Sequence, residues 1–578
     1  MCGIFGVTNF SINNLVKARA ALNTLSHRGP DQSNEYFDND IYLGHRRLSI
    51  LDLSENGRQP MVSEDQNIIL TVNGEIYNYK SLKNDLKTKY EFRSNSDSEV
   101  LLHGYAEWGI KKLLEKIEGM FAFCIYDKTI KKIFLARDRV GIKPLYYSNI
   151  NKEYCWASEL KAITNYYSEA SLVYDYTAIY DYLTYLYIPT PKTLYQNIFK
   201  LQPGYYLSIN PGSKKHELIN YWKLNISSNN DTIELASLKI KTLLKESINE
   251  QLMSDVPVGF FLSGGIDSGT VVALASEIGA DVHTYSIGFS EAKYDETSYA
   301  ELVANKFKTT HNKKILELDK TIDLFENIKN WYDEPFADTS CFPTFLVSEF
   351  AKKKATVVLT GDGGDEVFGG YRWYKSFEKY NHKKFPYPDV VRNLVMKFKL
   401  KKGITGKIGR YIETNFFIKE LDLYTRLMGG MLNHEKKKYR LFWNIPEDYD
   451  DYWYFRKFYR KDLDLYTRLQ YLDFHTYLPD DILTKVDRAS MAVSLECRVP
   501  LLSTALIEYL FSLSPEVRLY KSELKGAMKY TLRDTLPAEI INRDKAGFSI
   551  PLKQWKNQLF GQNYYRQEVI LDELFKIR

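Results

Sequence analysis

The sequence predicts a protein of two domains, the first rich in β-structure and the second an α/β fold with a doubly wound parallel sheet. The chain has 578 residues, which is too long for one hydrophobic core and indicates about two to four domains. Short apolar segments typical of strands dominate the first third, whereas strand and helix patterns alternate beyond residue 235. A polar, turn-rich stretch separates the two parts.

The overall charge argues against a nucleic-acid or membrane partner. The net charge of +5 arises from 78 basic and 73 acidic residues, which nearly cancel. No apolar run approaches the ~18 residues of a membrane span, and the start Met-Cys-Gly lacks the basic n-region and apolar core expected of a signal peptide. The five cysteines are scattered, without a CxxC pair or zinc spacing. We therefore expect a cytoplasmic protein with reduced thiols.

The first domain is predicted from strand patterns at Phe121–Tyr126 and Ile133–Ala136 and a helical pattern at Asp97–Ile117. Asn73-Gly74, between two apolar segments, predicts a hairpin turn. Cys2 is a candidate nucleophile. Removal of Met1 would give it a free α-amine beside its thiol, and the amine could take the thiol proton without a histidine.

Five segments in this order resemble the class II glutamine amidotransferases, which are N-terminal-nucleophile glutaminases. The segments are Cys2–Gly6 (CGIFG), Ser26–Asp31 (SHRGPD), His45–Ile50 (HRRLSI), Asn73–Asn78 (NGEIYN) and Ser96–Glu99 (SDSE). The resemblance implies a four-layer αββα sandwich and a glutamine site that includes Leu48, Ser49, Ile50 and Leu51.

The chemistry of the other residues in these segments fits that activity. Arg47 can clamp the α-carboxylate of glutamine, and Glu75 with Asp97 can hold its ammonium, although Arg47 and Asp97 could also form plain ion pairs. The side-chain NH₂ of Asn73 and the backbone N–H of Gly74 can stabilise the tetrahedral oxyanion.

We place the glutaminase at residues 2–205, a linker at 206–235 and the second domain at 236–578. The second domain is organised around Ser263-Gly264-Gly265-Ile266-Asp267-Ser268, between a predicted strand at 255–262 and a predicted helix at 269–278. Glycines and a helix N-terminus form an anion site. The segment lacks GxxxxGK[ST] and instead resembles the pyrophosphate loop of N-type ATP pyrophosphatases.

Two further predicted strands, 282–289 and 356–359, place more residues at the ATP site. Ile287 would lie beside the adenine, and the second strand ends in an acidic, glycine-rich loop that starts at Thr360. Asp267 and Asp365 could hold Mg²⁺ on the pyrophosphate, and Asp362 could orient the acceptor or act as an acid–base group. The ATP-binding residues predicted are Leu262, Ser263, Gly264, Gly265, Asp267, Ser268, Ile287, Thr360 and Gly361.

This order of domains resembles the glutamine-hydrolysing asparagine synthetases. Further matching segments are Tyr477–Asp481, Lys485–Arg488, Glu496–Pro500 and Arg543–Phe548. By this resemblance Lys545 neutralises charge on the adenylate and the leaving pyrophosphate. Asp362 departs from the family, in which many members carry Glu at this position. The resemblance therefore specifies the reaction more closely than it specifies the acceptor.

The resemblance implies a homodimer and a two-part reaction with glutamine and ATP as substrates. Cys2 releases ammonia from glutamine, and the second domain activates aspartate as an acyl-adenylate and amidates it, releasing AMP and pyrophosphate. One alternative keeps this chemistry on a sugar carboxylate of surface-polysaccharide synthesis. A tRNA-modifying pyrophosphatase would need a basic surface, which the balanced charge disfavours. A non-catalytic role is disfavoured because the expected polar groups are present.

Overall fold

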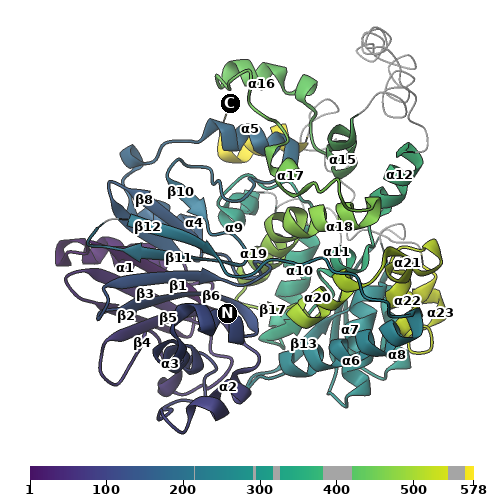
Figure 1. Cartoon of the computed structure of the whole chain (residues 1–578), viewed down its shortest axis with the longest axis horizontal. Coiled ribbons are helices and arrows are strands. Elements are labelled where there is room, and N and C mark those ends of the chain that lie inside the picture. Colours follow the sequence, from purple (N-terminus) through teal and green to yellow (C-terminus); the bar gives the residue numbers. More distant parts are fainter. Residues whose placement is uncertain are drawn as a thin grey trace.

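The computed structural model describes residues 1–213, 215–290, 295–316, 324, 326–381, 419–543 and 566–577. Figure 1 shows two stacked sheets, purple to blue, on one side of the molecule and a teal sheet wrapped by helices on the other. The N-terminal sheets are antiparallel and the C-terminal sheet is parallel. This arrangement confirms the predicted combination of an α+β and an α/β domain.

The two N-terminal sheets have six strands each. The first sheet has the order β10-β8-β9-β1-β3-β2, with β1 Gly3–Thr8, β2 Gln32–Phe37, β3 Ile41–Arg47, β8 Tyr146–Ile150, β9 Glu153–Ala157 and β10 Ile198–Lys200. The second has the order β12-β11-β7-β6-β5-β4, with β4 Met61–Val62, β5 Ile68–Ile76, β6 Gly119–Asp127, β7 Lys132–Arg137, β11 Tyr205–Asn210 and β12 Lys215–Asn220.

Helices cover the outer face of each sheet, which gives the predicted four-layer αββα sandwich. α1 (Leu15–Asn23) and α4 (Leu160–Tyr166) pack on the first sheet. α2 (Tyr79–Leu86) and α3 (Glu99–Lys116) pack on the second. A third apolar cluster, which includes the fully buried Trp156, fills the space between the sheets. The alternation of buried side chains along the strands explains why each sheet has two apolar faces.

Asn73-Gly74 is not a hairpin turn, so that prediction was wrong. β5 runs without a break through both residues, and Asn73 pairs with Ala122 and Gly74 with Phe121 of β6. A Cβ on Gly74 would lie 2.1 Å from the carbonyl oxygen of Met120. The glycine therefore permits close approach of the neighbouring strand, and pairing along the whole of β6 overrides the local turn propensity.

The segment predicted as a linker, residues 206–235, contains regular structure. β11 pairs with β7, and β12 pairs with β11, so both strands extend the second N-terminal sheet. Pro203 and Gly204, which mark the start of the predicted boundary, lie immediately before β11. Gly204 has a positive φ of 71°. We propose a boundary between the end of β12 at Asn220 and the start of α6 at Ile233.

The C-terminal sheet is parallel and doubly wound. Its order is β15-β14-β13-β16-β17, with β13 Val258–Phe261, β14 His283–Phe289, β15 Thr310–Leu316, β16 Val357–Leu359 and β17 Glu496–Arg498. The chain winds from β13 outward to β15 and then returns to the other side at β16. The carboxyl ends of β13 and β16 therefore form the switch point, where ligands bind in such sheets.

Helices pack on both faces of this sheet. On one face, α6 (Ile233–Gln251) and α7 (Ile266–Glu277) contact β13 and β16, and on the other α10 (Cys341–Lys352) and α19 (Leu483–Met491) contact β14 and β17. The remaining described α-helices are α5 Tyr176–Tyr185, α8 Thr297–Lys306, α9 Ile328–Tyr332, α11 Gly364–Phe368, α12 Arg372–Asn381, α15 Glu420–Met428, α16 Lys437–Phe442, α17 Trp453–Phe458, α18 Leu465–His475, α20 Thr504–Ser512, α21 Pro515–Arg518, α22 Gly526–Leu532, α23 Ala538–Ile541 and α25 Arg566–Val569.

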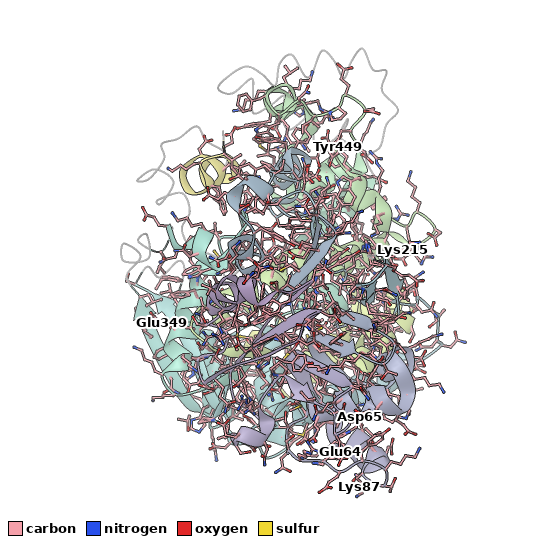
Figure 2. All side chains as sticks on the ribbon, turned by 90° about the vertical axis from the view of Figure 1, so that its left-hand side faces the viewer. Glu64, Asp65, Lys87, Lys215, Glu349 and Tyr449 are labelled. Carbon is pink, nitrogen blue, oxygen red and sulfur yellow. The ribbon has the colours of Figure 1, made fainter. Side chains whose placement is uncertain are left out.

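Charged side chains of both signs share the outside of the molecule. Glu64 and Asp65 lie at the same end as Lys87 in Figure 2. Of the helices in the described ranges, none has the length and apolar character needed to cross a membrane. All five cysteines are buried and unpaired.

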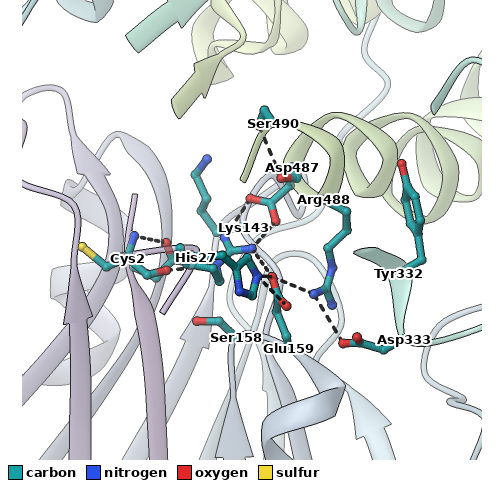
Figure 3. Close-up of polar contacts among 12 residues, drawn as sticks. Cys2, His27, Lys143, Ser158, Glu159, Tyr332, Asp333, Asp487, Arg488 and Ser490 are labelled. Atoms are coloured by element: carbon teal, nitrogen blue, oxygen red, sulfur yellow. Dashed lines mark hydrogen bonds and ion pairs between the residues drawn. The ribbon is translucent and has the colours of Figure 1, made fainter. Parts of the chain in front are cut away.

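Buried charges join the two domains (Figure 3). The guanidinium of Arg28 binds Glu159 of its own domain at 2.7 Å and Asp487 of α19 at 2.8 and 3.0 Å. Arg488 also binds Glu159, at 2.9 Å. Burial alone would raise the pKa of Asp487, but Arg28 outweighs it and holds that pKa below the usual value. These four side chains are at most 4% exposed, so each charge depends on its partners.

We predict that Arg28→Met destabilises the protein strongly. Asp487 would lose the only hydrogen-bonded partner that its carboxylate has among the described residues. Removing one member of a buried ion pair costs about 3–5 kcal/mol. Thermal denaturation should therefore show a clear fall in the midpoint. Arg19→Met is the matched control, because the Arg19 side chain is 55% exposed in its pair with Glu35 and should shift the midpoint little. Equal shifts for the two variants would contradict the prediction.

Candidate active sites

Cys2 lies immediately before β1, at the inner edge of the N-terminal domain. Its backbone N–H donates to Asn73 Oδ1 at 2.9 Å, and its side chain is buried. Burial raises the pKa of the Cys2 thiol, while the nearby terminal amine and a backbone hydrogen bond from Leu48 act in the opposite direction. The terminal amine of Met1 is itself buried and pairs with Glu496 of β17 at 2.7 Å.

The residues predicted to stabilise the oxyanion lie beside Cys2. Asn73 uses its Oδ1 to accept from Cys2, and its Nδ2 is buried without a hydrogen-bond partner among the described residues. A buried amide donor without a partner is costly, so it is available to an oxygen that arrives with the substrate. Gly74 follows it directly on β5. Only the extended strand, and not the predicted turn, places this side chain next to Cys2.

Glu75 and Asp97 form a buried acidic pair in the same domain. Asp97 Oδ2 accepts from the N–H of Ile76 at 2.6 Å. Burial raises the pKa of Asp97 to about 6. Burial, together with the charge of Asp97, raises the pKa of Glu75 well above its usual value. Arg498 of the second domain approaches Glu75, with 3.6 Å between Nη2 and Oε1. Such a pair is suited to receive a cation.

Arg47 is placed in the predicted glutamine site but already has several acceptors. Its guanidinium donates to the carbonyls of Leu51 and Ser54 at 3.2 and 3.1 Å and to Gln32 at 3.1 Å. It therefore holds the loop that follows β3. The N–H of Ser49 donates to Asp31 at 2.7 Å. Leu48 and Ile50 are buried in a cluster with Met1, Val357 and Met491 at the domain interface.

The predicted ATP loop lies at the carboxyl end of β13. Gly264 has a φ of +73°, and a Cβ there would lie 2.6 Å from the Tyr299 side chain, so a glycine is required. Gly265 caps α7 with extended backbone. The hydroxyls of Ser263 and Ser268 lie 3.1 Å apart. The loop thus presents a helix N-terminus and two hydroxyls, which are anion-binding groups.

The loop after β16 packs against this one. A Cβ on Gly361 would lie 2.6 Å from the backbone N of Ser268. Both loops line a cavity of about 710 Å³. The residues predicted for this site that line the cavity are Leu262, Ser263, Asp267, Ser268, Ile287, Thr360, Gly361, Asp362 and Asp365. Gly264 and Gly265 shape the loop without lining it.

A lysine that sequence reasoning missed lies between the two predicted metal ligands. Lys525, next to α22, forms ion pairs with Asp267 and, at 2.7 Å, with Asp365. Burial would lower the pKa of Lys525, but both carboxylates outweigh it and raise that pKa. Lys525 belongs to no recognisable motif and lies 258 positions from Asp267, so no local signal could have found it.

The two carboxylates fit a divalent cation in combination with substrate phosphates. Both converge on one cationic group, the Lys525 ammonium. Mg²⁺ commonly takes one or two carboxylates and completes its shell with phosphate oxygens and water. In the described part of the chain, no group of three or more His, Cys, Asp or Glu residues could hold a metal. Phosphate oxygens would therefore have to complete the shell.

The predicted catalytic Lys545 lies outside the described residues. Arg543, two positions earlier, donates to the Gly264 carbonyl at 3.1 Å and pairs with Glu296. Arg543, the first residue of the predicted segment Arg543–Phe548, therefore contacts the predicted phosphate loop. Of the other acidic residues after β16, Glu366 is buried and accepts from the hydroxyl of Tyr371 at 2.5 Å, which distinguishes it from the half-buried Asp362.

The raised pKa values of the acidic pair predict a pH dependence for glutamine binding. With a pKa of about 6, Asp97 binds a proton in the empty pocket as the pH falls through that value, and Glu75 does so at higher pH than a free carboxyl. The ammonium of glutamine needs ionised carboxylates, so its affinity should fall with the pH, by up to about tenfold per unit for each proton displaced.

Isothermal titration of glutamine into the Cys2→Ala variant from pH 5.5 to 8 measures this effect without turnover. Adding Asp97→Asn should flatten the profile and weaken binding throughout. A dissociation constant that stays the same across this range in Cys2→Ala would contradict the assignment of the acidic pair to the ammonium.

Comparison with known proteins identifies the family of each domain. The glutamine amidotransferase domain family matches residues 1–222, and the asparagine synthase family matches residues 239–572. Glutamine-hydrolysing asparagine synthetase 1 of Bacillus subtilis is 32% identical, with 97% of this chain and 88% of that protein covered. Glutamine-hydrolysing asparagine synthetase 3 of the same organism is 30% identical, with 95% and 87% covered. The chain belongs to the asparagine synthase family.

Proposed function

We propose that this protein is a glutamine-hydrolysing asparagine synthase, which amidates aspartate with ammonia from glutamine at the expense of ATP. The relatives that span nearly the whole chain carry this name. The observation that carries the proposal is the union of two sites in one chain. A buried thiol and an amide donor without a partner among the described residues share a domain with a buried acidic pair, and a parallel sheet presents the predicted phosphate loop at its switch point.

The first half of the reaction takes place at Cys2. Loss of Met1 would free the α-amine of Cys2, which takes the thiol proton as the sulfur attacks the side-chain amide of glutamine. Asn73 Nδ2 and the Gly74 N–H would stabilise the oxyanion. Ammonia leaves with a proton from that amine, and water then hydrolyses the thioester to glutamate. Glu75 and Asp97 would hold the substrate ammonium, and Arg47 its carboxylate.

The second half takes place in the cavity between β13 and β16. The side-chain carboxylate of aspartate attacks the α-phosphorus of ATP, and the bond to the β,γ-pyrophosphate breaks. Ammonia then attacks the acyl carbon and AMP leaves, so the products are asparagine, AMP and pyrophosphate. Asp362, half-buried on the cavity wall, would accept a proton from the attacking ammonia.

The charges of the pyrophosphate would be balanced by several groups. Asp267 and Asp365 would hold Mg²⁺, which when bound neutralises charge on the phosphates. Lys525 would exchange these carboxylates for phosphate oxygens when the nucleotide binds. By the resemblance to the asparagine synthetases, Lys545 would supply a further positive charge.

The assembly and location of the protein belong to this proposal as expectations. We propose a homodimer in the cytoplasm, with small molecules as substrates and no nucleic acid or membrane as partner. The five unpaired cysteines suit a reducing compartment.

The first test is the Cys2→Ala variant. With ATP, aspartate and glutamine it should form no asparagine, whereas with ammonium chloride it should form asparagine at a rate near that of the unchanged protein. Mass spectrometry identifies the amide. Cys155→Ala, which removes another buried thiol of the same domain, should keep both activities. Loss of the ammonium-driven reaction in Cys2→Ala would argue against two separate sites. Amidation of a uronic acid in place of aspartate would replace the proposed acceptor.

The second test concerns the bond of ATP that is cut. The products should be AMP and pyrophosphate, and Asp267→Asn should reduce their formation at least about 100-fold, since it removes charge stabilisation at the phosphates. Glutamine hydrolysis should remain. Asp281→Asn, at a side chain that is 87% exposed before β14, is the matched control and should retain synthesis. The formation of ADP and phosphate by the unchanged protein would refute the assignment of the phosphate loop.

A further inference from the structure

The cavity at the switch point extends beyond the phosphate loop to a second set of charges. Besides the loops after β13 and β16, its wall includes Asp338 and Ser340, before α10, and Lys485 of α19. These residues come from elements on the face of the sheet that packs against α10 and α19. Neither Asp338 nor Lys485 was assigned a role from the sequence.

Asp338 and Lys485 form an ion pair on the cavity wall. The Nζ of Lys485 lies 3.5 Å from Asp338 Oδ2. Asp338 is held in place by Ser340, whose N–H donates to Oδ1 at 2.9 Å and whose hydroxyl donates to Oδ2 at 2.7 Å. At 3.5 Å the pair is looser than a charged hydrogen bond, so a ligand can pair with both partners without displacing Ser340.

Both groups stay charged at neutral pH. Burial would lower the pKa of Lys485, but Asp338 and then Asp362 outweigh it, and that pKa is raised. Burial would raise the pKa of Asp338, but Lys485 and the bonds from Ser340 hold it at about 2. The interaction of Lys485 with Asp362 also places the pair close to the loop after β16.

We propose that Asp338 and Lys485 bind the α-groups of the amino-acid acceptor, with Asp338 receiving the ammonium and Lys485 the carboxylate. This inference rests on the proposed function. An α-amino acid carries opposite charges on one carbon, and an adjacent carboxylate and ammonium on a cavity wall are its complement. A buried charge left unpaired is costly, so such a site accepts a zwitterion and rejects an acid that lacks one of the charges.

Asp338, Lys485 and the loops that would bind the phosphates line the same cavity, and this arrangement would orient the acceptor for the reaction. The α-groups would be held at the wall formed by α10 and α19, and the side-chain carboxylate of aspartate would extend toward the loops that bind the phosphates. Arg372, at the start of α12, also lines the cavity, but its side chain is exposed. The proposal therefore assigns the α-carboxylate to the buried cation.

The test uses ATP–pyrophosphate exchange by the full chain with aspartate, succinate and β-alanine. Succinate is aspartate without the α-ammonium, and β-alanine is aspartate without the α-carboxylate. The unchanged protein should use aspartate well and both analogues at least about 100-fold less efficiently, because each leaves a charged group of the site without its ligand partner. Equal use of aspartate and succinate by the unchanged protein would overturn the proposal without any variant.

The variants then assign each charge. Asp338→Asn should lower kcat/KM for aspartate about 10- to 100-fold, mainly through KM, and leave the value for succinate within about threefold. Lys485→Met should do the same for aspartate and leave β-alanine nearly unchanged. Titration calorimetry of aspartate should show the same losses in binding. Arg372→Met is the matched control, and it should keep the preference for aspartate over β-alanine.

Each outcome separates this inference from the proposed function. If the unchanged protein shows no exchange with aspartate, the proposed acceptor is wrong. If it does, but Asp338→Asn lowers exchange with aspartate and succinate equally, the assignment of Asp338 is wrong. If Arg372→Met and not Lys485→Met abolishes the preference over β-alanine, the α-carboxylate is held by Arg372. An unchanged midpoint of thermal denaturation shows that each variant is folded.

Discussion

The arrangement of the two domains depends on the hydrogen bonds and ion pairs of the Arg28 guanidinium. Its Nε donates to the carbonyl of Cys2 at 3.1 Å, and its terminal nitrogens bind Glu159 and Asp487. One fully buried side chain thus ties the candidate nucleophile to both domains. A planar cation with five donors can satisfy several acceptors in fixed directions, which a lysine cannot do. Because these charges are buried, the domains cannot separate without leaving them unpaired.

A second buried connection runs from the glutamine pocket to the sheet of the other domain. Arg498 of β17 approaches Glu75, binds Glu496 at 2.7 Å and donates to the carbonyl of Gln251 at 2.7 Å. The backbone carbonyl of the same Arg498 accepts from Thr360, the first residue of the loop after β16. The residue that faces the acidic pair is therefore continuous with a strand that positions the ATP loops. Loss of the charge on Glu75 would weaken its attraction to Arg498 of this strand.

Burial changes the ionisation of the charged groups at the first site but not at the second. At Glu75 and Asp97, burial and the charges of neighbouring carboxylates outweigh the attraction of Arg498, and both pKa values are raised. At Lys525 and at Asp338 with Lys485, partners at close range keep the groups ionised. Under the proposed function, the first site would gain a cation from its substrate. The second would exchange internal ion pairs for ion pairs with its substrates, which would lower the desolvation cost of binding highly charged molecules.

The sequence alone determined the features that depend on neighbouring residues. These include the order of the domains, the strand–loop–helix at Ser263–Ser268 and the segments around Cys2, because strand periodicity and glycine positions are local signals. The tertiary structure decided where distant residues meet. Pairing with β6 kept Asn73-Gly74 in a strand, and pairing with β7 drew residues 205–220 into the N-terminal sheet. Lys525 reached Asp267 and Asp365, and Lys485 reached Asp338, only through packing of elements far apart in the chain. Burial and ion-pair partners together set the pKa of each group, and the partners lie too far away in the sequence to be recognised there.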